Sequence, residues 1–222
     1  MTFTTSRGAG TPPLRADAAR NRAQVLAAAR AAFRELGTAA PLDEIARRAG
    51  VNIATLYRRF PDRDALIRQV VVDGFALVLE SIQQALAVVS GDALSAIEGF
   101  LIHMVEERDM LALPLIGGPV TDDREAVELR GQIVSSLEEI LEVARAQEAI
   151  RHDVTAVDLI ATGVMACRPM PHLPAAQATA LAVRHVRVFV DGLRPADARP
   201  LPAAPTPDEI FIHVDVAGSR DD

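Results

Sequence analysis

Residues 41–66, PLDEIARRAGVNIATLYRRFPDRDAL, contain two short helical patterns separated by a tight turn. In the first pattern, apolar residues recur at the spacing of one helix face, namely Leu42, Ile45, Ala46 and Ala49. Gly50 follows this face, and glycine readily adopts the left-handed conformation that ends many helices. The first pattern therefore predicts a short helix that ends at Gly50.

The second pattern predicts a helix from Ile53 to Arg59 or Phe60. Asn52 precedes it, and an asparagine side chain can accept a hydrogen bond from the first turn, whereas Pro61 forces a break. Two helices joined by a short turn with glycine are typical of a helix-turn-helix. Leu56 and Phe60, four residues apart, are expected to face inward, and the residues that point elsewhere are Thr55, Tyr57, Arg58 and Arg59. This polar face suits a DNA major groove lined with phosphates, although the spacing alone also fits an ordinary helical hairpin with a solvated basic face.

Residues 49–66, AGVNIATLYRRFPDRDAL, closely resemble the signature of the tetracycline-repressor (TetR) family of transcriptional regulators. The matching positions are Gly50, Val51, Leu56, Tyr57, Arg58, Arg59, Phe60, Arg63 and Leu66. Arg59 stands where histidine is commonest, which keeps a charge able to bind phosphate. Asn52 stands where serine or glycine is usual, which keeps the helix cap.

The resemblance implies an all-α fold with an N-terminal three-helix helix-turn-helix DNA-binding domain and a C-terminal helical ligand-binding and dimerisation domain. It implies a sequence-specific DNA-binding regulator, a repressor that leaves a palindromic operator when a small-molecule effector binds. The partners would be double-stranded operator DNA, a second copy of the chain in a homodimer, and an unidentified effector. The predicted DNA-binding residues are Asn52, Ile53, Ala54, Thr55, Tyr57, Arg58, Arg59 and Arg63. Among them Tyr57, Arg59 and Arg63 would contact phosphates, and Thr55 and Arg58 are the best candidates for contacting bases.

The charge distribution is uneven along the chain. Residues 1–70 hold 12 arginines against 6 acidic residues, a balance of +6, and residues 71–222 hold 11 against 24, a balance of −13. A basic head joined to an acidic body fits a DNA-binding protein. It also fits an alternative function, a ligand-binding or scaffold protein whose basic head contacts an acidic partner other than DNA. Steep salt dependence of binding to duplex DNA would separate the two functions.

Composition limits the remaining classes. Half of the 222 residues are apolar and only 4% are aromatic, which is typical of a helix-rich globular protein. The single cysteine, Cys167, excludes an intrachain disulfide and a cysteine-rich zinc site. No apolar run approaches 18 residues and the N-terminus lacks an apolar signal core, so we expect no membrane contact and a cytoplasmic location.

The chain divides into four predicted segments. Residues 1–14 form a disordered tail, 15–66 the helix-turn-helix domain, 67–194 the effector-binding and dimerisation domain, and 195–222 a flexible tail. A long helix after the helix-turn-helix would connect the two domains and run to about residue 88. The first helix is expected from about Ala18 to Leu36, and on it either Arg20 or Arg22 lies near a phosphate, unless both are merely solvated.

Five further elements are expected in the second domain. Helices are predicted at 92–108, 122–148, 156–167 and 175–193, with a short helix and loop at 110–121. The residues expected to face inward include Val127 in the helix at 122–148 and Leu181 in the helix at 175–193. By resemblance, the last two long helices would form the four-helix bundle of a dimer.

No catalytic group of residues is visible. The five histidines are scattered, no spacing suggests a metal site, and we expect neither a cofactor nor an enzyme activity. The candidate effector-pocket residues are Phe100, His103, Met104, Met110 and Met165, and each of them also fits the core of a helical domain. Cys167 fits either a redox sensor or a small core residue.

Overall fold

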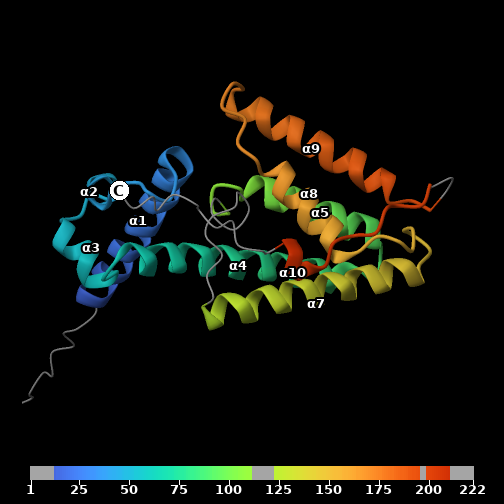
Figure 1. The fold of residues 1–222 in the computed structure, drawn as a ribbon, viewed down its shortest axis with the longest axis horizontal. Helices are drawn as coiled ribbons and strands as arrows, with labels where there is room; N and C mark the ends of the chain where they lie inside the picture. The colour runs from blue at the N-terminus through green and yellow to red at the C-terminus, as the bar shows by residue number, and fades with distance from the viewer. Residues whose placement is uncertain (1–12, 112–122, 196–198, 211–222) are drawn as a thin grey trace, which may run out of the picture. The chain divides into compact units, whose positions relative to one another are not determined.

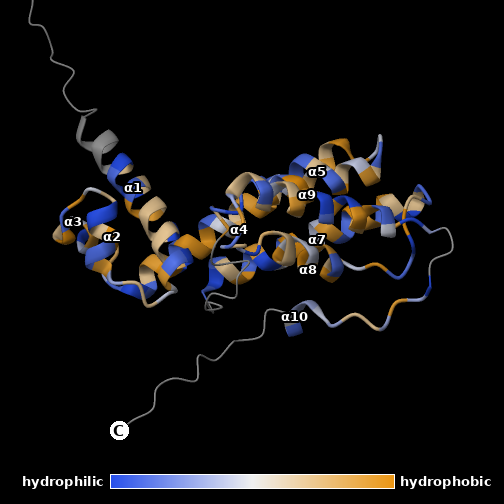
Figure 2. Ribbon diagram, turned by 90° about the horizontal axis from the view of Figure 1, so that it is seen from above, coloured by the Kyte–Doolittle hydropathy of each residue, from blue (hydrophilic) through white to orange (hydrophobic). Residues whose placement is uncertain are grey.

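The computed structural model describes residues 13–111, 123–195 and 199–210. Within these ranges every regular element is an α-helix, which confirms the predicted all-α fold. The helices are α1 (Pro13–Leu36), α2 (Leu42–Arg48), α3 (Ile53–Arg59), α4 (Arg63–Val88), α5 (Ala93–Glu106), α7 (Arg124–Ala146), α8 (Ala156–Ala166), α9 (Ala175–Gly192) and α10 (Pro207–Ile210) (Figure 1). The chain divides into two compact units, Met1–Leu66 and Ile67–Asp222. Figure 2 shows apolar and polar residues side by side along the helices, as expected where each helix buries one face.

The first unit is built around α1, α2 and α3, with α2 in contact with both of its neighbours. Its core contains four fully buried side chains from four different helices, Phe33, Ile45, Leu56 and Leu66. Leu66 belongs to the first turn of α4, so the beginning of this helix completes the core of the unit. This core holds the inner side of α3 in place, and the outer side of α3 remains exposed to solvent.

The corner between α2 and α3 has the local structure that its residues favour. Gly50 adopts a left-handed φ of 66°, and the backbone N–H of Val51 donates to the carbonyl of Ala46 at 3.1 Å. The Oδ1 atom of Asn52 accepts a hydrogen bond from the N–H of Ala54 at 2.8 Å. Asn52 therefore caps α3, as predicted, and the sharp corner sets the direction in which α3 leaves α2.

The second unit is organised around α5, which packs against α7, α8 and α9. Its core consists largely of aliphatic residues, and the fully buried ones include Ile97, Leu101, Met104, Leu137, Ile140, Leu141 and Val186. Three of its helices begin at polar caps, Asp92, Asp123 and Thr155. Asp92 accepts from the N–H of Ser95, Asp123 accepts from the N–H of Glu125, and the N–H of Thr155 donates to Asp158 in the first turn of α8. The observed helices lie within the predicted ranges 92–108, 122–148, 156–167 and 175–193.

Two side chains in this unit face solvent although their spacing predicts burial. Val127 on α7 is 46% exposed and Leu181 on α9 is 47% exposed in the single chain. On α9 the buried stripe runs instead through Ala178, Ala182, Val186 and Val190, at intervals of four residues. Leu181 precedes one of these positions and therefore lies beside the stripe rather than on it.

Residues 199–201 contact the rest of the second unit. The backbone N–H of Leu201 donates to Asp153 at 2.8 Å, and the guanidinium of Arg151 donates to the carbonyl of Arg199 and to Asp153. Residues 199–201 are therefore held against the second unit, although they lie in the segment 195–222 that is predicted to be a flexible tail. The predicted N-terminal tail up to residue 12 and most of the predicted 110–121 segment lie outside the described residues. None of the helices described is both long and apolar enough to cross a membrane.

Candidate nucleic-acid interface

Helix α3 has one buried side and one exposed side. Leu56, on the inner side, is fully buried, and Phe60, which follows the helix, is buried with it. An α-helix advances by about 100° per residue, so Arg58 lies about 200° round from Leu56, on the opposite side. Arg58 is exposed, as is Ala54 one turn before it, and Thr55 beside them is partly exposed. The centre of the outward face is therefore Arg58.

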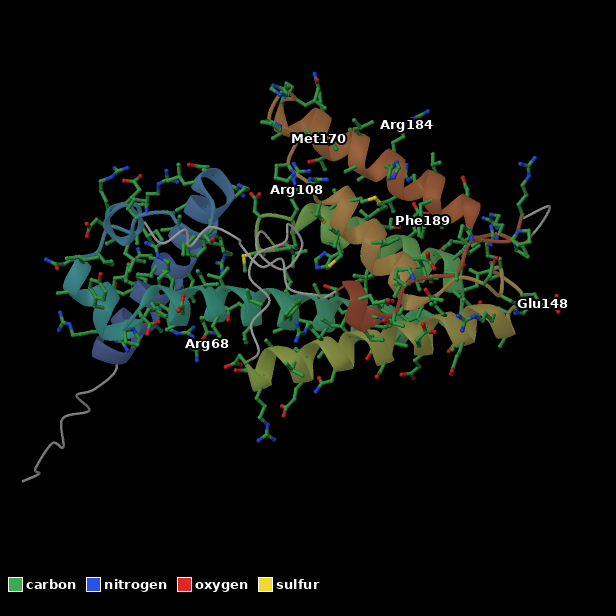
Figure 3. The ribbon with its side chains drawn as sticks, in the orientation of Figure 1. Arg68, Arg108, Glu148, Met170, Arg184 and Phe189 are labelled. Carbon is green, nitrogen blue, oxygen red and sulfur yellow. The ribbon has the colours of Figure 1, made fainter. Side chains whose placement is uncertain are left out.

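Tyr57 and Arg59 lie on either side of Arg58, each about 100° round the helix from it. Tyr57 is 49% exposed and Arg59 is exposed. Figure 3 shows nitrogen-tipped side chains projecting from the α2 and α3 end of the first unit. A central arginine with a phenol and a second arginine at the edges matches a groove that has bases in its floor and phosphates along its walls.

The guanidinium of Arg58 is held by its own helix. Its Nε donates to the carbonyl of Ala54 at 3.2 Å, and its Nη2 donates to the hydroxyl oxygen of Thr55 at 3.5 Å. Both acceptors are uncharged, so these bonds leave the positive charge of Arg58 uncompensated. The two residues that the sequence indicates as base contacts are thus in contact with each other.

Arg63 lies in the first turn of α4 and faces the first unit. Its Nη1 atom donates to the carbonyl of Thr38 at 2.9 Å and to the carbonyl of Ala40. The sequence predicts a phosphate contact for Arg63, and it gives no sign of these bonds to the connection between α1 and α2. Such bonds depend on the tertiary fold, because the partners lie more than twenty residues apart in the chain. The phosphate contact of Arg63 remains a prediction.

Arg22 of α1 contacts Phe60, the residue that follows α3. Its guanidinium lies over the ring of Phe60, 5.9 Å from the ring centroid, where a cation and an aromatic face attract each other. Arg22 therefore supports the end of α3. The structure also gives Arg20 an interaction, so neither arginine is merely solvated.

The arginines of α2 are neutralised by acidic neighbours. Glu44 accepts hydrogen bonds from Arg47 and Arg48 at 2.7–2.8 Å, and Arg48 also bonds to Glu35 of α1 at 2.7 Å. These bonds, first that of Arg47 and then that of Arg48, lower the pKa of the Glu44 carboxyl from 4.5 to about 2. The uncompensated charge of Arg58 on α3 thus contrasts with the paired charges on α2.

The predicted effector-pocket residues differ in their surroundings. Phe100 and Met104 are buried in α5, whereas His103 and Met110 are partly exposed. His103 lies 4.0 Å from a carboxylate oxygen of Glu106, one turn further along the helix. Nothing in the positions of these four residues assigns a ligand to them, so their role in an effector pocket remains a prediction.

Met165 does not fit a buried pocket, because it is 56% exposed on α8. The buried face of α8 is formed by Leu159, Thr162, Gly163 and Ala166, which follow the spacing of one helix face, and Met165 falls outside it. Cys167, in contrast, is buried, and its Sγ lies 3.2 Å from the carbonyl oxygen of Met104. Burial raises the pKa of the Cys167 thiol to about 12, so the thiolate needed for redox sensing is disfavoured. The core alternative for Cys167 is therefore the better one.

One face of α9 carries apolar side chains in contact with solvent. Val188 is 62% exposed and Leu181 is 47% exposed in the single chain. Arg184 and His185, between them in sequence, are exposed as well, and Figure 3 shows Arg184 pointing outward from α9. Among residues 13–111, 123–195 and 199–210, no group of three or more histidine, cysteine or acidic side chains could hold a metal ion.

Comparison with known proteins connects both units to regulators. Residues 25–70 match the model described as bacterial regulatory proteins, tetR family, and residues 91–195 match that of the C-terminal domain of SbtR-like transcriptional regulators. Both models describe regulatory proteins rather than enzymes. No protein of curated function matches the chain.

Several solved structures are similar over nearly their whole length. A TetR transcription regulatory protein from Mycobacterium vanbaalenii is 33% identical with a TM-score of 0.53, and the match covers 82% of this chain and 99% of that one. The TetR transcriptional regulator SCO0520 from Streptomyces coelicolor is 31% identical with a TM-score of 0.51, covering 79% and 99%. A gamma-butyrolactone receptor described as ArpA-like shares the fold at 18% identity and a TM-score of 0.54, covering 78% and 99%.

Proposed function

The chain belongs to the TetR family of bacterial regulatory proteins, and we propose that it is a repressor that a small molecule releases from a palindromic operator. Family membership makes it a DNA-binding transcriptional regulator with a helix-turn-helix. The direction of regulation, the dimer and the effector belong to the proposal.

The observation that carries the proposal is the two-sided character of α3. Its inner residue Leu56 is fully buried, and its outer side presents Arg58 between Tyr57 and Arg59. In the proposed complex the outer side enters the major groove. Tyr57 and Arg59 contact phosphates on the two walls, and Arg58 with its neighbours faces the base edges. Phosphate contacts supply much of the affinity, and the base contacts supply sequence preference.

A palindromic operator requires two copies of the chain, related by a two-fold axis. The exposed apolar side chains of α8 and α9, Met165, Leu181 and Val188, support a dimer in which these helices pack against their counterparts. Burying such side chains against a second copy is favourable because each would leave water. This arrangement agrees with the four-helix bundle that the family resemblance implies.

The effector would act on the second unit, where α5 contributes Phe100, His103 and Met104. A gamma-butyrolactone receptor with the same fold supports the idea that such a helical unit can hold a small organic molecule. Release needs only that the effector binds better to the conformation that does not fit the operator. A coupling of about 1–3 kcal/mol between the two sites is typical and would suffice for a change in occupancy.

Transcription in vitro from the promoter next to the operator tests the direction of regulation. The proposal predicts that adding the protein lowers transcript yield and that a control promoter without the operator is unaffected. An increase in yield at the same protein concentrations would show an activator instead.

A further inference from the structure

The outward face of α3 contains a contact between two side chains that changes their expected roles. Arg58 donates through Nε to the carbonyl of Ala54 at 3.2 Å and through Nη2 to Oγ1 of Thr55 at 3.5 Å. Thr55 thus uses its hydroxyl oxygen to hold an arginine. It is also less exposed than Arg58, which lies at the centre of the face.

The guanidinium of Arg58 retains enough donors to contact DNA after these bonds are made. A guanidinium has five N–H donors in a planar fork, and the bonds to Ala54 and Thr55 use two of them. Three donors remain, and they are distributed over both terminal nitrogens. A fork with one donor on each terminal nitrogen matches the O6 and N7 acceptors that guanine presents in the major groove.

The neighbouring side chains of α3 cannot take this role. Ala54, one turn before Arg58, has only a methyl group, which suits a thymine methyl rather than a hydrogen-bonding edge. The Oδ1 atom of Asn52 caps the helix by accepting from the N–H of Ala54, and the single amide nitrogen that remains does not provide the two donor nitrogens of a guanidinium fork. Tyr57 and Arg59 lie about 100° to either side of Arg58, toward the groove walls.

We propose that Arg58 recognises a guanine in each operator half-site and that Thr55 is a positioning residue that holds the Arg58 guanidinium in place. Thr55 then contributes to sequence preference through Arg58 rather than by contacting a base. Holding the long side chain in one orientation reduces the conformational entropy that it loses on binding. This inference rests on the proposed binding of α3 in the major groove.

The test begins with the full-length protein and a randomised duplex library, from which the preferred operator is selected. Each guanine of the selected half-site is then replaced in turn by 7-deazaguanine, which lacks N7, or by inosine, which keeps O6 and N7 and lacks only the minor-groove amino group. Dissociation constants are measured for the wild type and for Arg58→Gln, Thr55→Val and Thr55→Ser. Circular dichroism and thermal unfolding confirm that each variant is folded.

For the wild type we expect 7-deazaguanine at one guanine per half-site to weaken binding about tenfold, and inosine at that position to have little effect. Arg58→Gln should bind the guanine and 7-deazaguanine duplexes equally well. Thr55→Val, which keeps the shape but lacks the acceptor, should lose most of the discrimination, and Thr55→Ser should retain it.

Two results would overturn the inference while leaving the proposed function intact. If Arg58→Gln still discriminates between the two duplexes, another residue recognises the guanine. If Thr55→Val discriminates as well as the wild type, Thr55 does not position Arg58. Recovery of no preferred sequence, together with no salt-dependent binding to duplex DNA, would instead show that the proposed function itself is wrong.

Discussion

Arg63 donates a hydrogen bond to the backbone carbonyl of Thr38 at a distance of 2.9 Å, and the same nitrogen also bonds to the carbonyl of Ala40. The beginning of α4 is thereby attached to the connection between α1 and α2. Since Leu66, one turn further along α4, is part of the same core, Arg63 supports the unit that presents α3.

Replacing Arg63 by alanine should lower the stability of the first unit. The change leaves two backbone carbonyls without their charged donor, and a loss of about 1–2 kcal/mol is expected for such bonds at a partly exposed position. Urea unfolding of Arg63→Ala and of the control Arg59→Ala measures the difference. If the two variants are equally stable, Arg63 has no structural role and its contribution must be sought in phosphate binding.

The double variant Tyr57→Phe with Arg59→Ala should weaken binding to all duplexes by a similar factor. Both residues lie beside the outward centre of α3, where phosphates are expected, so their loss removes affinity without changing sequence preference. The magnitude of the slope of log K against log salt should fall by about two, because each of the two chains on the operator loses one arginine. Titrations of the selected operator and of a random duplex at several salt concentrations measure both quantities. A changed preference at unchanged slope would show that these residues contact bases.

Replacing Val188 by glutamate should convert the proposed dimer into monomers. Val188 is 62% exposed in the single chain, and burying a charge against a second copy is strongly unfavourable. Val127→Glu on α7 is the matched control, because Val127 is also an exposed valine on a helix, at 46%. Light scattering after gel filtration gives the mass of each variant. A Val188→Glu protein that remains dimeric would place the interface elsewhere.

The first unit should lose stability in acid through Glu44. Its folded pKa of about 2 lies below the ordinary 4.5, so the stabilisation is present in full above pH 4.5. It decreases as the pH falls and disappears near pH 2, where the folded carboxyl also becomes protonated. Thermal unfolding of the wild type and of Glu44→Gln between pH 2 and pH 6 measures this contribution. The difference in melting temperature should shrink toward pH 2, and a constant difference would contradict the predicted linkage.

Cys167 should be unreactive in the folded protein. Burial raises the pKa of its thiol to about 12, so very little thiolate forms at neutral pH. Iodoacetamide at pH 7.5 should label the protein only after denaturation, as measured by mass spectrometry, and mild peroxide should leave operator binding unchanged. Rapid labelling of the native protein would restore the redox alternative.

Local signals predict much of this fold. Gly50, Asn52 and Pro61 define the boundaries of α3 because each acts through its own backbone conformation or through a neighbouring N–H. Contacts between distant segments are not encoded in this way. The bonds from Arg63 to Thr38 and Ala40 depend on how α4 begins relative to the first two helices, and no spacing in the sequence reveals them.

The spacing of apolar residues also fails to predict burial where a helix has more apolar residues than its packed face can bury. Met165 and Leu181 are apolar and lie near buried positions, yet each falls outside the buried stripe of its helix. Their exposure depends on how α5, α8 and α9 pack together, which the spacing of apolar residues does not specify. The contact between Arg58 and Thr55, in contrast, joins residues three positions apart on one helix. The sequence indicates both residues but not the hydrogen bond between them.

Binding of the purified protein to the intergenic DNA upstream of its own gene tests the central claim most directly. Titrations at two salt concentrations, with random duplex as competitor, measure affinity, salt dependence and specificity together. The account predicts tight binding of two chains per site, resistance to competitor, and a marked loss of affinity at the higher salt concentration. Equally weak binding to both DNAs would mean that this region does not contain the operator. An absence of salt-dependent binding to any duplex would contradict the account.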